Sequence, residues 1–287
     1  MCDDAKMIRT TTLEIGSLAF TVDVAGPERG DLVLLLHGFP QTRYAYRHEL
    51  ALLAEAGYCA AAPDQRGYSP GARPGDVAEY GIDFLVGDVL AIASALGHER
   101  FHLVGHDWGG QVAWVTAARH PERVRTLTVL SRPHPAAFAA AIASDPEQPK
   151  RSRHHRAFQK ADAADPLLAD DAAALRRAFA EQGVPPADTE AYLSTLSDRA
   201  ALDAAIQWYR AAAGSSGGAG GVSPVPVPTL YVWGNADATV GRPAAEATAR
   251  FVTGPYRFVE LDGIGHFATD QAPGAIDEAL LAHLASA

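Results

Sequence analysis

The chain alternates short apolar runs with longer segments in which apolar residues recur at helical spacing. Residues 32–36 are apolar throughout, which is typical of a strand buried on both faces of a parallel sheet. The β-rich runs 10–15 and 18–24 meet at a Gly-Ser pair and predict a hairpin. Further strands are predicted at 58–62, 101–104, 124–130, 229–233 and 256–261, and helices at 49–57, 83–96, 109–119, 243–251 and 275–284.

The alternation breaks between residues 133 and 228, where the pattern predicts helices at 171–182, 189–196 and 200–213. Strands that alternate with helices predict an α/β fold with a mostly parallel, doubly wound sheet. We expect the inserted helical block to cover the carboxyl ends of the strands, where open sheets bind ligands. The predicted organisation is a core of residues 1–133 and 228–287 with a helical cap of residues 134–227. The glycine- and serine-rich run 214–221 is a candidate hinge for this cap.

Composition excludes several classes of protein. The chain has 287 residues, of which 48% are hydrophobic and 20% charged, so it can bury a sizeable core. Its net charge of −10 predicts no nucleic-acid partner. The two cysteines support neither a disulfide framework nor a zinc site. The polar N-terminus and the short apolar runs predict no signal peptide, no membrane span and a cytoplasmic location. A monomer and a homodimer are both open.

The sharpest chemical signal is the segment 105–110, Gly-His-Asp-Trp-Gly-Gly, which follows a predicted strand and opens a helix. A nucleophile between two such glycines in this setting is a nucleophile elbow. Its central residue is Asp107, a carboxylate that is ionised at neutral pH and can attack carbon without a base. This favours displacement at a saturated carbon over ordinary ester hydrolysis. The alternative is that Asp107 only caps the following helix.

Two later segments supply the partners that such a nucleophile needs. Asp237 ends the segment Trp-Gly-Asn-Ala-Asp after one predicted strand, and His266 follows the last strand. Nucleophile, acid and histidine therefore occur in the chain order of an α/β-hydrolase triad. We predict that His266 acts as a general base on water and that Asp237 orients its ring. Taken singly, either residue could be an ordinary loop or surface residue.

The segment 37–40, His-Gly-Phe-Pro, directly follows the central strand. This loop and the residue after the nucleophile supply the oxyanion-hole N–H groups in such folds, so Phe39 and Trp108 are the candidates. His37 is a further candidate for the substrate site, although the segment could also be only a tight turn. Asp64 is expected to hold its own loop together, with Arg66 as its candidate partner.

Together with the segment 64–67, Asp-Gln-Arg-Gly, these motifs make residues 15–284 resemble an α/β-hydrolase of the epoxide hydrolase and haloalkane dehalogenase group. The resemblance implies opening of a small organic epoxide to a vicinal diol through an ester on Asp107, without a metal or cofactor. The family places two tyrosines in its lid. The segment 206–210, Ile-Gln-Trp-Tyr-Arg, resembles the one that carries the first, so Tyr209 is the expected acid.

The second lid tyrosine is missing, and His154, with His155 beside it, stands near its expected position. A histidine can also donate to an oxygen, so we expect His154 to replace the tyrosine. The alternative is a solvated basic helix face, because Arg151, Arg153 and Arg156 surround the pair.

Two other functions stay open at this point. A haloalkane or haloacid dehalogenase would use the same Asp nucleophile. It is favoured by the Trp at 108 and disfavoured by the Phe at 39, where haloalkane dehalogenases carry a polar halide ligand. Fluoroacetate dehalogenases usually have Arg after the nucleophile. The second alternative is a catalytically silent or lactone-handling binding protein. Which epoxide is used cannot be predicted.

Overall fold

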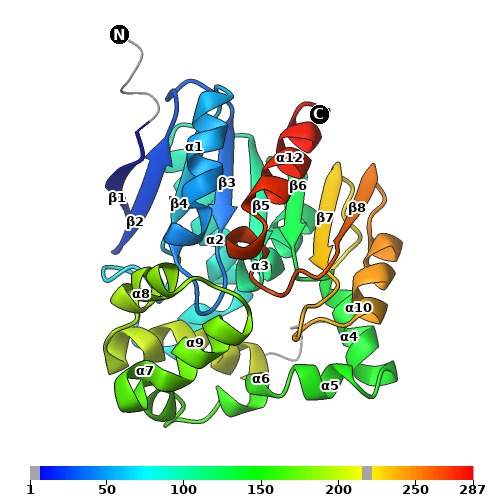
Figure 1. The fold of residues 1–287 in the computed structure, drawn as a ribbon. Coiled ribbons are helices and arrows are strands. Elements are labelled where there is room, and N and C mark those ends of the chain that lie inside the picture. Colours follow the sequence, from blue (N-terminus) through cyan, green and yellow to red (C-terminus); the bar gives the residue numbers. More distant parts are fainter. Residues whose placement is uncertain (1–6, 215–221, 287) are drawn as a thin grey trace.

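An eight-stranded sheet forms the centre of the computed structural model, which describes residues 7–214 and 222–286 (Figure 1). Its strand order is β1-β2-β4-β3-β5-β6-β7-β8. The β1–β2 and β2–β4 pairs are antiparallel, and the pairs from β4 onward are parallel, so the predicted mostly parallel sheet is confirmed. The strands are β1 (Arg9–Ile15), β2 (Leu18–Ala25), β3 (Leu32–Leu36), β4 (Cys59–Pro63), β5 (Phe101–His106), β6 (Val124–Leu130), β7 (Thr229–Gly234) and β8 (Tyr256–Leu261).

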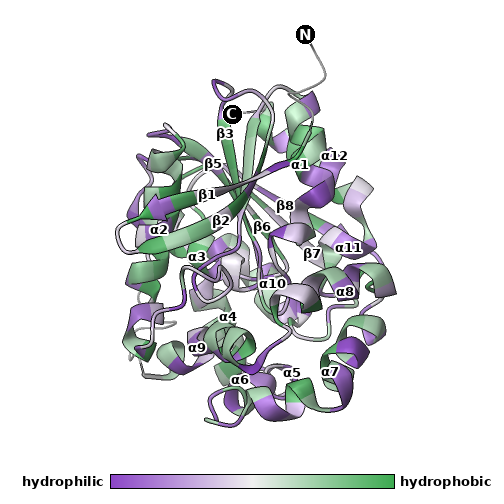
Figure 2. Ribbon diagram, turned by 90° about the vertical axis from the view of Figure 1, so that its left-hand side faces the viewer, coloured by the Kyte–Doolittle hydropathy of each residue, from purple (hydrophilic) through white to green (hydrophobic). Residues whose placement is uncertain are grey.

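Helices cover both faces of the sheet because the strands are apolar on both sides. In β3, Leu32 and Leu34 pack into one apolar cluster with α2 and α3, whereas Val33 and Leu35 pack into another with α1 and α12. Figure 2 shows the hydrophobic strands in the interior and polar residues on the outer faces. The helices outside the insertion are α1 (Arg47–Glu55), α2 (Ile82–Ala95), α3 (Trp108–Arg119), α10 (Arg242–Ala247), α11 (Ala268–Gln271) and α12 (Pro273–Leu284), with 3₁₀ turns at Arg43–Tyr46, Val77–Tyr80 and Thr248–Phe251.

Between β6 and β7 the described residues form six helices, which gather at one end of the sheet (Figure 1). These are α4 (Pro135–Ser144), α5 (Gln148–Arg151), α6 (His154–Ala157), α7 (Ala164–Glu181), α8 (Pro186–Thr195) and α9 (Arg199–Gly214). The pattern predicted helices only for the region of α7 to α9. It missed α4, and α5 and α6 are single turns, too short to show a period. The candidate hinge beyond Gly214, residues 215–221, lies outside the described residues. No described helix is long and apolar enough to cross a membrane.

Close packing of β3, β5 and α3 forces the turn at Asp107. The backbone of Asp107 has φ 48° and ψ −116°, a strained conformation for a residue with a side chain. A Cβ atom added at Gly109 would lie 2.1 Å from the Leu36 carbonyl oxygen, and one added at Gly105 would lie 2.4 Å from the Gly109 carbonyl oxygen. Only glycine fits at these two positions, which is the local geometry of a nucleophile elbow.

The predicted pairing of Asp64 with Arg66 is wrong. Arg66 donates two hydrogen bonds of 2.7 Å to Asp88 on α2, and this buried pair fixes the guanidinium. Asp64 instead accepts from the backbone N–H of Arg43 at 2.9 Å and pairs with the Arg43 side chain. Sequence proximity favoured the wrong partner because the true partners are brought together only by the packing of the sheet.

Candidate active site

Asp107, Asp237 and His266 meet at the carboxyl ends of β5, β7 and β8. The His266 Nδ1 atom lies 2.9 Å from Asp237 Oδ2, and its Nε2 atom lies 3.6 Å from Asp107 Oδ2. The three residues are buried, with 9% of Asp107, 2% of Asp237 and 5% of His266 exposed. The imidazole therefore lies between two carboxylates in a site that excludes most water.

This arrangement favours a charged imidazole in the resting site. Burial disfavours the charged form of His266, but Asp237 and then Asp107 outweigh it and raise the His266 pKa to about 10. Burial also opposes ionisation of Asp107, yet its contacts with His266 lower the Asp107 pKa. For Asp237 the attraction of His266 similarly exceeds the effect of burial, and its pKa falls to about 2. Both carboxylates are thus ionised at neutral pH.

Two hydroxyl side chains that the sequence analysis did not identify complete the contact between Asp237 and His266. Ser131 Oγ donates to Asp237 Oδ2 at 2.6 Å and lies 2.8 Å from His266 Nδ1. Thr239 Oγ1 donates to Asp237 Oδ1 at 2.7 Å and lies 2.7 Å from the same nitrogen. The backbone N–H groups of Thr239 and Val240 also donate to Asp237 Oδ1. The Asp-x-Thr spacing at 237–239 hinted at this turn, but nothing in the sequence pointed to Ser131.

A cavity of about 500 Å³ opens onto this site. Phe39, Asp107 and His266 line it from the core, whereas His154 and Tyr209 line it from the helical insertion. The carboxylate of Asp107 and the phenol of Tyr209 thus share one cavity, although they are 102 positions apart in the sequence. The volume is that of an ordinary small-molecule site.

Tyr209 is held among aromatic rings. Its ring centroid lies 5.0 Å from those of Trp108 and Phe158 and 5.7 Å from that of Phe39, in edge-to-face contacts. Burial raises the Tyr209 pKa well above its usual value, so the hydroxyl is protonated at neutral pH and can donate.

His154 and His155 occupy different surroundings. His154 is half-buried, lines the cavity, and its ring centroid lies 6.1 Å from that of Tyr209. His155 does not line the cavity; it stacks on Trp108, with 6.2 Å between the ring centroids, and its ring centroid lies 5.3 Å from that of Tyr209. Burial lowers the pKa of both histidines, that of His155 to about 3. The expectation of a solvated face therefore does not describe His154.

The backbone N–H of Phe39 donates to Asp107 Oδ1 at 3.1 Å, and Trp108 is the first residue of α3. His37 is fully buried and, like Trp108 and Asp237, does not line the cavity. Its Nε2 atom accepts from the backbone N–H of Gln65 at 3.3 Å, and its carbonyl accepts from the Gln65 side chain at 2.6 Å. His37 thus fixes the shape of the loop that carries Phe39.

The helical insertion also holds the two loops that carry Asp237 and His266. Gln148 on α5 accepts from the backbone N–H of Gly241 at 2.9 Å and donates to the Thr239 carbonyl at 2.7 Å. Arg151 donates to the Asp237 carbonyl at 2.9 Å. Gln182, just after α7, accepts from the backbone N–H of His266 at 3.1 Å. Displacing the insertion would therefore disturb both loops.

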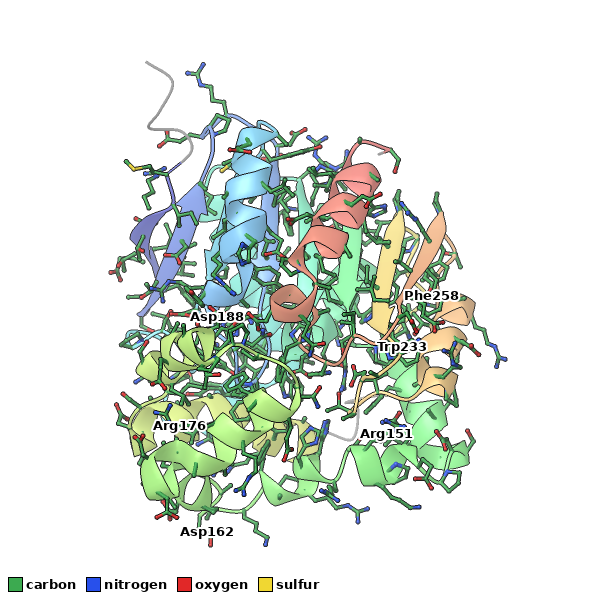
Figure 3. The ribbon with its side chains drawn as sticks, viewed as in Figure 1. Arg151, Asp162, Arg176, Asp188, Trp233 and Phe258 are labelled. Carbon is green, nitrogen blue, oxygen red and sulfur yellow. The ribbon has the colours of Figure 1, made fainter. Side chains whose placement is uncertain are left out.

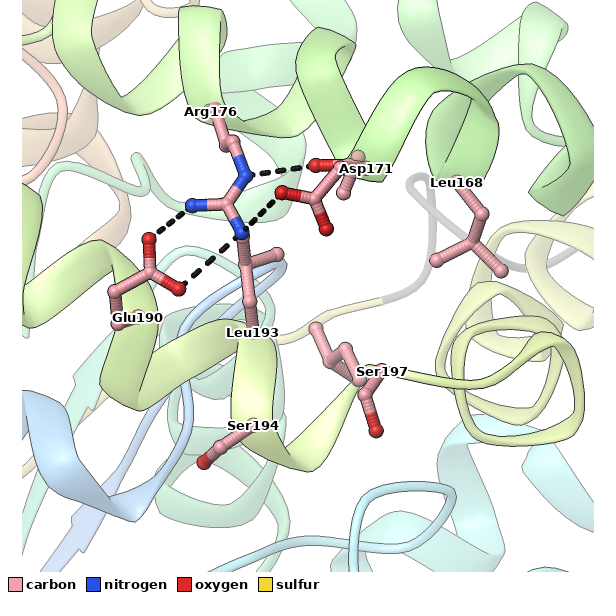
Figure 4. Close-up of a pocket in the computed structure, with 9 residues that line it drawn as sticks. Leu168, Asp171, Arg176, Glu190, Leu193, Ser194 and Ser197 are labelled. Atoms are coloured by element: carbon pink, nitrogen blue, oxygen red, sulfur yellow. Dashed lines mark hydrogen bonds and ion pairs between the residues drawn. The ribbon is translucent and has the colours of Figure 1, made fainter.

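A second cavity, of about 270 Å³, lies between α7 and α8 and offers no comparable chemistry (Figure 4). Arg176 in its wall pairs with Glu190 and donates to the Asp171 carbonyl at 2.7 Å. Its charges are thus already paired within the insertion. Within residues 7–214 and 222–286, no three His, Cys, Asp or Glu side chains gather in a way that could hold a metal ion.

Comparison with known proteins agrees with the fold. Residues 31–273 match the family described as alpha/beta hydrolase fold. The AB hydrolase superfamily protein YfhM of Bacillus subtilis is 30% identical, with 96% of this chain and 98% of that protein covered. Epoxide hydrolase A of Mycobacterium tuberculosis is 32% identical, with 91% of this chain and 92% of that protein covered. A solved epoxide hydrolase A of Mycobacterium thermoresistibile superposes with a TM-score of 0.83 at 27% identity, with 97% of this chain and 98% of that chain covered.

The protein is thus a hydrolase whose fold places a carboxylate at the nucleophile elbow. Since the family match spans most of the chain, the chain belongs to the alpha/beta hydrolase fold family.

Proposed function

We propose that the protein is an epoxide hydrolase that opens an epoxide to a vicinal diol through an ester on Asp107. The observation that carries the proposal is the shared cavity, which the ionised Asp107 and the protonated Tyr209 both line. An epoxide needs a nucleophile at carbon and a donor at oxygen, and these two side chains supply them. The epoxide hydrolase names of the relatives support the same reaction.

In the first half of the reaction Asp107 attacks an epoxide carbon from the side opposite the ring oxygen. The carbon–oxygen bond of the ring breaks, a bond from carbon to the Asp107 oxygen forms, and the ring oxygen takes a proton from Tyr209, assisted by a hydrogen bond from His154. His266 enters this step as an imidazolium, so it holds a proton that can restore the Tyr209 hydroxyl. The ester, the hydroxyl group and a neutral His266 result, with no proton drawn from bulk water.

In the second half His266 removes a proton from water, and the resulting hydroxide attacks the Asp107 ester carbonyl. The N–H groups of Phe39 and Trp108 stabilise the tetrahedral oxyanion. As it collapses, its remaining hydroxyl proton passes to the departing diol oxygen, so the diol leaves, the Asp107 carboxylate is restored and His266 is again an imidazolium. Esterification prepares this step, because the neutral ester no longer holds the His266 pKa up. Asp237, Ser131 and Thr239 keep the ring oriented throughout.

We also propose that residues 134–227 act as a cap on a core of residues 1–133 and 228–287. Support comes from Tyr209 and His154, which line the cavity from the insertion, while Asp107 lines it from the core. The cap would supply the acid and the core the nucleophile, so neither part would open an epoxide alone.

The test is the intact mass of a His266→Gln variant exposed separately to epoxides and to haloalkanes. Without its base the enzyme should stall as the ester, and an epoxide adds its whole mass whereas a haloalkane adds only its alkyl group. Epoxide adducts on the Asp107 peptide, absent from an Asp107→Asn/His266→Gln variant, are expected. Adducts from haloalkanes alone would replace the proposal with a dehalogenase. No adduct from either panel would support a catalytically silent protein.

A further inference from the structure

The cavity carries basic side chains that the proposed reaction does not use. Lys150, Arg151 and Arg153 all line it, and all lie in or directly after the short helix α5. The whole chain has a net charge of −10, so three cavity-lining cations within four residues contrast with the overall charge. Figure 3 shows Arg151 on the insertion, below the strand ends.

Two of these three cations are not neutralised by a carboxylate. Lys150 pairs with Glu147 at 2.6 Å, outside the cavity lining. Arg151 donates one N–H to the Asp237 carbonyl, a neutral acceptor, so it keeps its charge and its other donors. Within the part of the chain that the structure describes, the Arg153 side chain has no ion pair and no hydrogen bond. One acid, Glu181, lines the same cavity and opposes them.

The reacting groups do not neutralise the positive charges of Arg151 and Arg153. The two carboxylates of Asp107 and Asp237 are offset by the imidazolium of His266 and by the guanidinium of Arg132, which interacts with Asp107. Burial lowers the pKa of His154, so it adds no cation at neutral pH. An unpaired guanidinium facing a cavity offers a planar set of donors that matches a carboxylate in two parallel hydrogen bonds.

We propose, on the basis of the epoxide hydrolase function above, that the substrate is an epoxide that carries a carboxylate. Arg153, with the free donors of Arg151, binds the carboxylate, and the epoxide ring lies against Asp107 and Tyr209. Because the carboxylate is bound away from the reacting atoms, its binding lowers KM and leaves kcat nearly unchanged.

The test compares kcat/KM for matched pairs of probes that differ only in charge. One pair is para-oxiranylbenzoate and para-oxiranylbenzamide, and the other is a terminal epoxyhexanoate and its primary amide. We expect the acid of at least one pair to be preferred about fivefold or more, as a single partly exposed charge contact allows. The preference should lie in KM and should shrink at high salt.

Arg153→Glu is expected to abolish or reverse the preference. Arg156→Glu is the matched control, because Arg156 is exposed on α6, does not line the cavity, and changes the net charge equally. Glu181→Gln tests the same charge from another helix, because it removes the acidic side chain that opposes the cations in the cavity. It should strengthen the preference for the acid probe over the amide probe.

Equal kcat/KM for acid and amide in both pairs, unchanged in Arg153→Glu and Glu181→Gln, would overturn the substrate class and leave the epoxide hydrolase function standing. Equal losses in Arg153→Glu and Arg156→Glu would also overturn it, because the effect would then be one of overall charge. Failure of the proposed epoxide hydrolase function can be distinguished from failure of the substrate class. It would show as no turnover of any probe and no ester adduct in His266→Gln.

Discussion

The charge of Asp107 should set the protonation state of His266. The imidazole lies between two carboxylates, with Nε2 3.6 Å from Asp107 and Nδ1 2.9 Å from Asp237. Asp107→Asn replaces one carboxylate by a neutral amide of the same shape, as formation of the ester would. We therefore expect the His266 pKa to be lower in this variant. Its value there should approximate the His266 pKa in the ester intermediate, in which His266 must act as a base.

The magnitude follows from the distance. Two unit charges 3.6 Å apart interact by about 4.6 kcal/mol at an effective dielectric constant of about 20, which corresponds to about 3 pKa units. The His266 pKa would then fall from about 10 to about 7. A base with that pKa is about half neutral at pH 7, so loss of the Asp107 charge would make His266 available to accept a proton.

The assay is a pH titration of the histidine side chains by nitrogen NMR. Burial lowers the pKa of His37, His106 and His154, so a histidine that titrates near pH 10 stands apart from them. His266→Gln assigns that signal by removing it. Asp64→Asn is a matched control, because it removes a carboxylate 4.0 Å from His37 and should leave His266 unchanged. An Asp107→Asn midpoint within about half a unit of the wild-type value would refute the reasoning.

The charge of the His266 imidazolium should also contribute to the free energy of unfolding. Because the folded pKa of His266 is raised, its contribution is fully present below its unfolded pKa of 6.5 and is lost as pH rises to about 10. The free energy of unfolding, measured by urea denaturation, should therefore fall across this window, by about 5 kcal/mol at most. In Asp107→Asn, where the His266 pKa is expected near 7, this pH-dependent fall should shrink to below about 1 kcal/mol.

Four further substitutions test the supports of the site. Gln148→Ala leaves the Gly241 N–H and the Thr239 carbonyl without their partner, so urea denaturation should show a loss of about 1–3 kcal/mol. Thr239→Val removes the hydroxyl between Asp237 and His266 at nearly equal volume, and rapid-quench mass spectrometry should show a longer-lived ester. Gly109→Ala forces a Cβ atom against the β3 backbone, and thermal denaturation should show a loss above about 4 kcal/mol. Asp88→Ala leaves the buried Arg66 unpaired and should cost about 3–5 kcal/mol by the urea assay.

The sequence predicted best what depends on local periodicity and on chain order. The strands of the core could be placed because they are apolar or β-branched runs bounded by turn residues. Asp107, Asp237 and His266 could be proposed because each lies in the turn or loop that follows a strand, and parallel strands bring their carboxyl ends to one edge. The structure brings these three side chains together, as that reasoning expects.

Side chains that act through contacts across the fold could not be predicted in this way. Ser131 has φ 64° after β6, and only this backbone turn directs its hydroxyl to Asp237 and His266. A serine at a strand end is otherwise an ordinary loop residue. The same limit explains the wrong partner for Asp64, since Arg43 is 21 positions away and meets it only in the folded sheet.

Gln148 and Gln182 extend this argument from the site to the insertion. Both belong to the helical segment that sequence periodicity placed least well, yet they bind the backbones of the two loops that carry Asp237 and His266. Their side chains are uncharged, so no charge pattern distinguishes them from other glutamines. The insertion therefore does more than cover the cavity: its position is coupled, through four hydrogen bonds, including that of Arg151, to the geometry of the proposed base. A substitution that shifts α5 or the end of α7 should change the rate of ester hydrolysis, even where it leaves Tyr209 and Asp107 untouched.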